Sequence, residues 1–125
     1  MISIKEGAFA HSKIQTIELP NNLQHLYTEV FAFCRLLETV VIGNNLKNIA
    51  NRTFLGCYAL EKIYIPNSVE RISIDAFKEC KNLYVYTNNK YVQTFCEAFD
   101  IPWESWHNET EELSTHEAFD ILNDI

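Results

Sequence analysis

Apolar residues return at a nearly constant interval along most of the chain. Intervals of 22, 23 and 23 residues separate four phenylalanines, Phe9, Phe31, Phe54 and Phe77. An aliphatic residue stands five residues before each of them, and another stands five or six residues after it. A unit of about 23 residues is too small to bury its own apolar side, so such units are stable only when they stack on one another. The period therefore predicts a solenoid.

Each unit also contains a short stretch in which apolar and polar residues alternate, as in a strand with one buried face. The alternation predicts that seven side chains point inward: Ile17, Leu19, Val40, Ile42, Ile63, Ile65 and Val85. Turns are expected after the first three stretches, at residues 20–22, 43–45 and 66–68, because Pro fixes φ and Asn tolerates the left-handed region. Each unit is thus expected to contain a strand, a turn, a second short extended segment and a loop anchored by Phe.

Two stretches carry a family resemblance: TFLGCYALEKIYIPNSVERI at residues 53–72 and AFKECKNLYVY at residues 76–86. They resemble the leucine-rich repeats of the BspA-like class, whose consensus runs roughly AFxxCxxLxxIxIPxxVxxI. The resemblance covers residues 4–103, in which residues 90–98 resemble the closing helix of such arrays and residues 100–103 the last extended piece. It implies a leucine-rich repeat solenoid of about four rungs, one per repeat, with a parallel β-sheet, stacked Phe rings inside and a short C-terminal capping helix.

The resemblance also bears on activity, because such repeats serve as protein-binding and surface-binding scaffolds and share no catalytic residues. The residues agree with this implication. No GxSxG, Walker loop or HExxH is present, and the chain has only three glycines from which a phosphate-binding loop could be built. We therefore expect a protein that is not an enzyme and that needs no cofactor.

The outward positions of the strands give a candidate binding surface. Alternation leaves two outward columns, one of Thr16, Thr39, Lys62 and Tyr84 and one of Glu18, Val41, Tyr64 and Tyr86. Tyr is enriched in the cores of protein interfaces. We therefore expect a partner-binding surface formed by Val41, Lys62, Tyr64, Tyr84 and Tyr86. The alternative is that β-branched and aromatic residues stand here only because they are good strand formers that pack across rungs.

Three of the four cysteines follow the same period, because Cys34, Cys57 and Cys80 each lie three residues after a repeated Phe. Stacking should align them in one column, where three equivalent residues cannot all pair, so buried free thiols are expected. One disulfide or a metal site is the alternative. Metal is disfavoured because no CxxC is present and neither His11 nor His25 has a spacing suited to zinc. The first unit is one residue shorter than the others, which is expected to place His11 where they have Cys.

The composition changes near residue 103, which divides the chain into a solenoid with its cap at residues 1–103 and an acidic tail at residues 104–125. The sequence STHE at residues 114–117 is typical of a helix capping box, and an apolar stripe follows at Ala118, Ile121, Leu122 and Ile125. A helix of about 11 residues is not stable alone in water, so it should dock on the last rung or on another protein. In the second case the tail would bind through Glu111, Glu112, Phe119, Ile121 and Leu122.

The formal net charge of −7 and the pI near 5.0 argue against direct binding of nucleic acid, because Lys and Arg must neutralise its phosphates. Residues 1–13 lack the basic and apolar regions of a signal peptide, and no apolar run is long enough for a membrane span. A cytoplasmic protein is therefore expected, without nucleic acid or membrane as partner. Met1 favours a whole protein over a fragment.

Three functions fit these observations. The first is a non-enzymatic protein-binding scaffold that acts by occupying a partner protein's surface. The second is a small acidic inhibitor of the phage type, which blocks a nucleic-acid-handling protein such as a host defence nuclease. The third is a cell-surface adhesion module, against which the missing signal sequence counts. A homodimer is also expected, because nothing covers the edge of the first rung, which contains Ile2, Ile4, Ile14 and Ile17.

Overall fold

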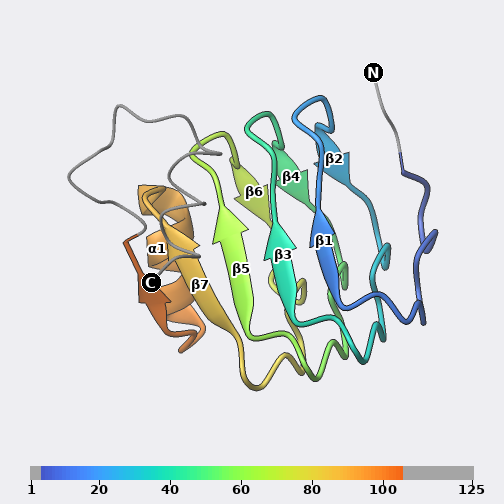
Figure 1. The fold of residues 1–125 in the computed structure, drawn as a ribbon. Coiled ribbons are helices and arrows are strands. Elements are labelled where there is room, and N and C mark those ends of the chain that lie inside the picture. Colours follow the sequence, from blue (N-terminus) through green and yellow to red (C-terminus); the bar gives the residue numbers. More distant parts are fainter. Residues whose placement is uncertain (1–3, 106–125) are drawn as a thin grey trace, which may run out of the picture.

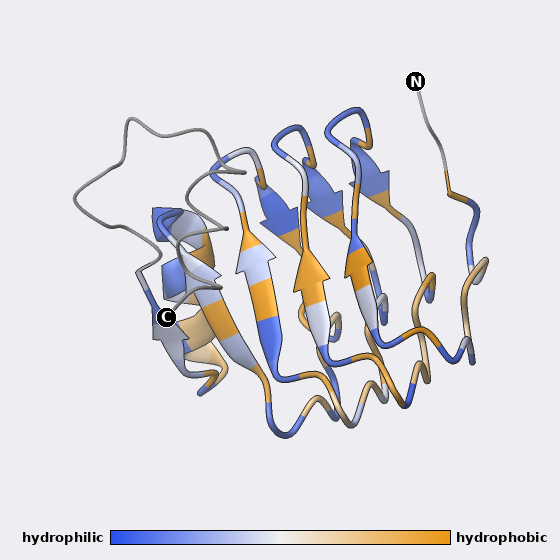
Figure 2. Cartoon of the chain, in the orientation of Figure 1, coloured by the Kyte–Doolittle hydropathy of each residue, from blue (hydrophilic) through white to orange (hydrophobic). Residues whose placement is uncertain are grey.

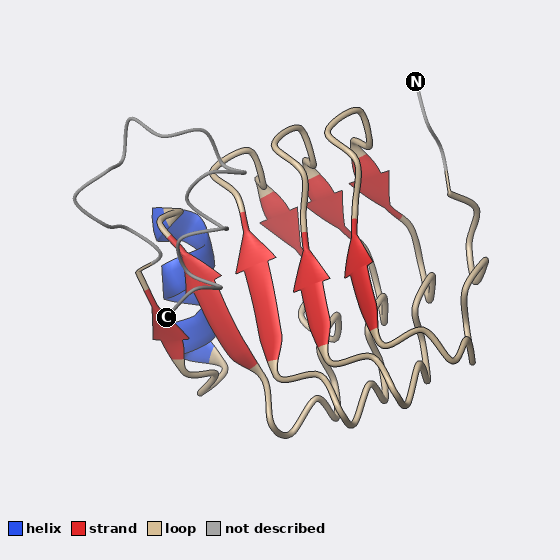
Figure 3. Ribbon diagram, viewed as in Figure 1, coloured by secondary structure: helices blue, strands red, loops and turns tan. Residues whose placement is uncertain are grey.

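The structure is a computed structural model that describes residues 4–105. The chain winds into a solenoid with two parallel sheets and one short helix at its C-terminal end (Figure 1). Short strands alternate with loops and turns along the whole winding (Figure 3).

The main sheet has the order β1 (Thr16–Glu18), β3 (Thr39–Val41), β5 (Lys62–Ile65), β7 (Tyr84–Thr87) and β8 (Trp103–Glu104). The second sheet has the order β2 (His25–Leu26), β4 (Asn48–Ile49) and β6 (Arg71–Ile72), and the helix is α1 (Lys90–Ala98). The predicted leucine-rich repeat solenoid with a parallel sheet and a C-terminal capping helix is confirmed.

The strands of the main sheet stack in the register that the period predicts. Ile17 pairs with Val40, Val40 with Ile63 and Ile63 with Val85. All of these side chains except the half-buried Ile17 are fully buried. In the second sheet each strand begins with a hydrophilic residue and ends with a buried hydrophobic one, which gives the blue and orange halves of β2, β4 and β6 in Figure 2. The core therefore lies between the two sheets.

A column of aromatic rings runs along the loop that joins each second-sheet strand to the next main-sheet strand, called here the Phe loop. Ring centroids are 5.6 Å apart for Phe9 and Phe31, 5.5 Å for Phe31 and Phe54, and 5.4 Å for Phe54 and Phe77, with interplanar angles of 9° or less. Phe31, Phe54 and Phe77 are buried, as predicted, whereas Phe9 is 39% exposed. Phe9 differs because it is the first ring of the column and has a stacked neighbour on one side only.

The shortened first unit does not place His11 opposite a cysteine, so this prediction is wrong. The N–H of His11 donates to the carbonyl of Ala32, and its ring stacks on Phe33 with centroids 5.3 Å apart. His11 and Phe33 both have a positive φ, of 64° and 58°. The missing residue therefore falls after His11, between it and Ile14, where a loop can be shortened without breaking the stack.

The C-terminal end is closed by side chains that replace the contacts of a further rung. The N-cap Asn89 accepts hydrogen bonds from the N–H groups of Tyr91 and Val92, and its Nδ2 donates to the carbonyls of Pro66 and Val69. The hydroxyl of Tyr91 accepts from the N–H of Ile72, at the edge of the second sheet, at 2.9 Å. Together with β8, which pairs with β7, these contacts satisfy edge groups that would otherwise lack partners.

Gly56 and Gly7 form a matched pair that tests the packing of the Phe loops. Both have a positive φ, of 70° and 67°, but a Cβ on Gly56 would lie 2.5 Å from the ring of Phe33, whereas a Cβ on Gly7 would meet nothing within 4 Å. We expect Gly56→Ala to lower the free energy of unfolding by about 1 kcal/mol or more beyond the loss from Gly7→Ala, because overpacking adds to backbone strain. Urea unfolding of the two variants measures the difference, and equal losses would contradict it.

Asn89 gives a second prediction, because it both caps α1 and binds the turn below it. Asn89→Ala removes a helix cap and leaves carbonyl groups near Pro66 and Val69 without their donor, so we expect the free energy of unfolding to fall by about 2–4 kcal/mol. The control is Asn88→Ala at the exposed neighbouring position, for which a loss within about 0.5 kcal/mol is expected. Similar losses for the two variants in thermal or urea unfolding would show that the cap is not the source of stability.

Candidate functional site

Two neighbouring strands of the main sheet bring three tyrosines together. Tyr64 on β5 pairs in register with Tyr86 on β7, and their rings stack with centroids 4.8 Å apart at an interplanar angle of 17°. Tyr84, two residues before Tyr86 on the same strand, is tilted against it with centroids 5.2 Å apart. Lys62 pairs with Tyr84 and Val41 with Tyr64, so the five predicted residues do lie side by side. They are called here the tyrosine patch.

The accessibility of the tyrosine patch differs from the prediction at two positions. Lys62 is exposed, and Tyr84 and Tyr86 are half-buried. Val41 and Tyr64, however, are only 9% and 5% exposed. Their place on the outward face was predicted correctly but their exposure was not, because large residues that pair across neighbouring strands cover one another. The accessible part of the patch is therefore Lys62, Tyr84 and Tyr86, with Val41 and Tyr64 supporting it.

The surroundings of the patch favour the neutral phenols of Tyr64 and Tyr86. Burial, together with the neighbouring Tyr86, raises the pKa of Tyr64 above its ordinary value. Burial also raises the pKa of Tyr86, with smaller contributions from Glu104 and Tyr84. Neutral phenols that present ring area and a hydroxyl group suit a contact surface rather than acid–base chemistry. The predicted tail residues Glu111, Glu112, Phe119, Ile121 and Leu122 lie outside the described residues.

The cysteines form the predicted column in the interior. Each thiol donates to the carbonyl of the Phe one rung earlier, at 3.1 Å: Cys34 to Phe9, Cys57 to Phe31 and Cys80 to Phe54. All four cysteines of the chain are free; Cys34, Cys57 and Cys96 are buried and Cys80 is half-buried. The thiols of Cys34, Cys57 and Cys80 therefore act as hydrogen-bond donors between rungs.

Their surroundings make the thiols of Cys57 and Cys96 poor nucleophiles. The neighbouring Cys34 lowers the pKa of Cys57, but Cys80 and burial outweigh it and raise that pKa to about 12. Burial raises the pKa of Cys96 to about 12, with a smaller contribution from Glu97.

Residues 4–105 contain no group of three or more His, Cys, Asp or Glu side chains that could hold a metal ion. Within the same residues, no helix is long and apolar enough to cross a membrane.

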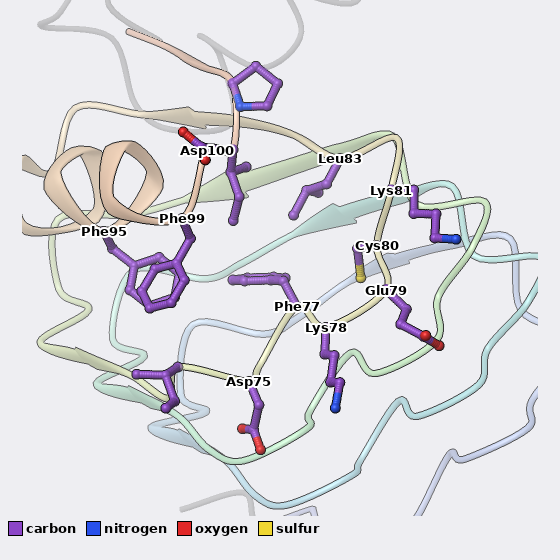
Figure 4. Close-up of a pocket in the computed structure, with 13 residues that line it drawn as sticks. Asp75, Phe77, Lys78, Glu79, Cys80, Lys81, Leu83, Phe95, Phe99 and Asp100 are labelled. Carbon is purple, nitrogen blue, oxygen red and sulfur yellow. The ribbon is translucent and has the colours of Figure 1, made fainter.

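A pocket that the sequence did not predict lies at the C-terminal end of the Phe column. Its volume is about 470 Å³, and Figure 4 shows Phe95 and Phe99 together on one side, Phe77 near the middle of the view, and Leu83, Lys78 and Lys81 beyond it. The pocket forms because residues from α1 and the segment after it stand opposite the last Phe loop. The only sequence signal for it is that Phe77 is the last ring of the repeat series.

The fold and the repeated contacts define a leucine-rich repeat solenoid, in which each rung supplies one strand of the main sheet and one Phe to the interior. The family model of the BspA type leucine-rich repeat region matches residues 1–99 in six copies, and the chain belongs to this family. No significantly similar protein was found among the curated proteins or among the solved structures.

The raised pKa values of the buried thiols predict a pH dependence of stability. In the unfolded chain a thiol ionises near its ordinary pKa of 9.0, whereas the folded chain keeps Cys57 and Cys96 protonated up to about pH 12. The unfolded state therefore binds fewer protons above pH 9, and the free energy of unfolding should fall as the pH rises between about 9 and 12. Urea unfolding at several pH values measures this slope. Cys57→Ala should reduce it, and an unchanged slope in that variant would contradict the assignment.

Proposed function

We propose that this protein is a non-enzymatic scaffold that binds another protein through the tyrosine patch and acts by occupying the partner's surface. The family to which the chain belongs suggests a scaffold of the protein-binding or adhesion type. The single observation that carries the finer proposal is the cluster of Tyr84 and Tyr86 beside Lys62 on the outward face of the main sheet. Aromatic residues on a rigid sheet are typical anchors of protein interfaces.

The arrangement of the patch supports this use. The ring of Tyr64 on the neighbouring strand stacks on Tyr86 and restricts its side chain. Little side-chain entropy of Tyr86 is therefore left to be lost when a partner binds. At the border of the patch, Glu18 pairs with Val41, Thr39 with Lys62 and Glu104 with Tyr86. Glu18 and Glu104 are exposed and Thr39 is half-buried, which gives the aromatic centre a polar rim. A central aromatic anchor with a polar rim is the usual anatomy of a protein-binding surface.

Action by binding rather than by catalysis agrees with the interior chemistry. The buried thiols are held protonated, and the perturbed phenols belong to the patch itself. We also propose that the protein works in a reducing compartment such as the cytoplasm. The four free cysteines support this, because oxidising compartments favour disulfides.

A second candidate function is the acidic inhibitor of the phage type, favoured by the distribution of charge. The formal net charge is −7, and the residues after Trp106 contain six acidic side chains and no Lys or Arg. Such a segment could imitate the phosphates of a nucleic acid toward a basic protein. A complex that weakens steeply with added salt would favour this candidate over the scaffold, because surface charges are screened by salt. The homodimer through the first rung also stays a prediction.

Matched tyrosine variants test the proposed function. We expect Tyr84→Ala and Tyr86→Ala each to weaken binding of the partner by about 1–3 kcal/mol. The control is Tyr27→Ala, which truncates a tyrosine that is 43% exposed and lies beside the second sheet. The immobilised wild-type protein and each variant are exposed to the same cell lysate, and the retained proteins are quantified by mass spectrometry.

The expected result is a protein that the wild type and Tyr27→Ala retain and that both patch variants lose. The thermal stability of the patch variants should be similar to that of the wild type. Equal retention by all four proteins would remove the patch as the binding surface. Equal loss of stability and binding in the patch variants would show that the tyrosines serve strand packing alone.

A further inference from the structure

Within residues 4–105, the C-terminal cap leaves one side of the last rung without a covering element. On the main sheet β8 pairs with β7, and at the edge of the second sheet the hydroxyl of Tyr91 accepts from the N–H of Ile72. The third side is the last Phe loop, residues 74–83, and the pocket of about 470 Å³ opens there (Figure 4). The pocket thus lies where the Phe loop of a further rung would stack.

The backbone of this loop has free donors. In the inner rungs, the N–H of each repeated Phe and the N–H two residues later donate to carbonyls of the next Phe loop. In the third rung these bonds run from Phe54 to Ala76 at 2.9 Å and from Gly56 to Lys78 at 3.0 Å. The equivalent N–H groups of Phe77 and Glu79 have no hydrogen-bond partner within residues 4–105. An extended segment that offers two carbonyls at the same spacing would satisfy both.

The aromatic column also ends differently here. Phe31 and Phe54 have a parallel ring on each side, whereas Phe77 meets Phe95 at 66° with centroids 6.4 Å apart. Phe99, which packs on Phe95 and lines the pocket, is 45% exposed. An apolar side chain that entered the pocket would contact Phe77, which is 8% exposed, and would cover the exposed part of Phe99.

One segment outside the described residues has the pattern of a Phe loop. Residues 118–125 read AFDILNDI, which has apolar residues at the first, second, fifth and eighth positions, as does AFKECKNL at residues 76–83, and one more at the fourth position. Phe119 corresponds to Phe77, and Leu122 to Cys80. The alternative, an amphipathic helix, would use the stripe at Ala118, Ile121, Leu122 and Ile125, which omits Phe119.

We propose that residues 118–122 bind to the uncovered side of the last rung of the same chain, with the ring of Phe119 in the pocket. The register of the inner rungs then lets the carbonyls of Ala118 and Asp120 accept from the N–H groups of Phe77 and Glu79. It also places Asp120 beside Lys78, which is exposed at the pocket. The segment would thus act as the loop of a partial further rung.

The length of the connecting chain permits this contact. Ile101 and Pro102 line the pocket, and the described residues end at Ser105, only a few residues later. Phe119 lies fourteen positions after Ser105, a stretch that can span roughly 46 Å when extended. A tether of this length gives an effective concentration on the order of millimolar, which favours the chain's own segment over a second copy or a partner.

Amide hydrogen exchange of the full chain, measured by NMR, tests the proposal at the two donors. The N–H groups of Phe77 and Glu79 should be protected in the wild type, and Phe119→Ala should raise their exchange rates by about tenfold or more. The matched control is Ile125→Ala, which removes a side chain of the helical stripe outside residues 118–122 and should leave both rates unchanged. The N–H of Phe54, which donates to Ala76, reports in each variant that the solenoid is intact.

Three results would overturn the proposal. The first is unprotected exchange at Phe77 and Glu79 in the wild type. The second is an effect of Ile125→Ala without an effect of Phe119→Ala, which would indicate a docked amphipathic helix. The third is protection that rises with protein concentration, which would show that a second copy occupies the pocket. None of these outcomes bears on the tyrosine patch, which lies on the main sheet.

Discussion

The stacking of each Phe loop on the next is the interaction on which the rest of the structure depends. The rings lie 5.4 to 5.6 Å apart and nearly parallel, and the N–H groups of Phe9, Phe31 and Phe54 each donate to a carbonyl of the following loop. A rung must therefore return to the same place after a fixed length of chain. The in-register strands and the thiol column follow from this constraint, because every residue meets its counterpart one rung away.

The same constraint explains what could be predicted from the sequence. A near-constant period identifies equivalent residues, so the inward places of Ile63 and Val85 and the neighbourhood of Tyr64 and Tyr86 follow from counting. Exposure does not follow from counting, because it depends on the size of the neighbours, and Tyr64 is buried on an outward position. The position of a missing residue does not follow either. The first unit is one residue short, but only the pairing of His11 with Phe33 shows where.

The end of the array follows different rules from its interior. The helix and the last strand were predictable because such arrays need a closing unit, yet the pocket was not. It depends on how Phe95 and Ile101, which belong to no repeat, stand opposite Phe77. Irregular segments make contacts that have no counterpart elsewhere in the chain, so no periodicity reports them. In a repeat protein, a structure therefore gives the most information beyond the sequence at the positions where the repeat pattern ends.

The two ends of the described solenoid are held with unequal strength, and this sets an order in which the rungs open. In a solenoid each rung is stabilised mainly by its nearest neighbours, so opening proceeds from an end. At the first rung Phe9 is partly exposed and Ile14 is half-buried, whereas the last rung is tied to α1 through Asn89 and Tyr91. Fraying should therefore begin at the first rung and reach β5 and β7 last. The strands that carry Tyr64, Tyr84 and Tyr86 should therefore stay folded while the first rung unfolds and refolds locally.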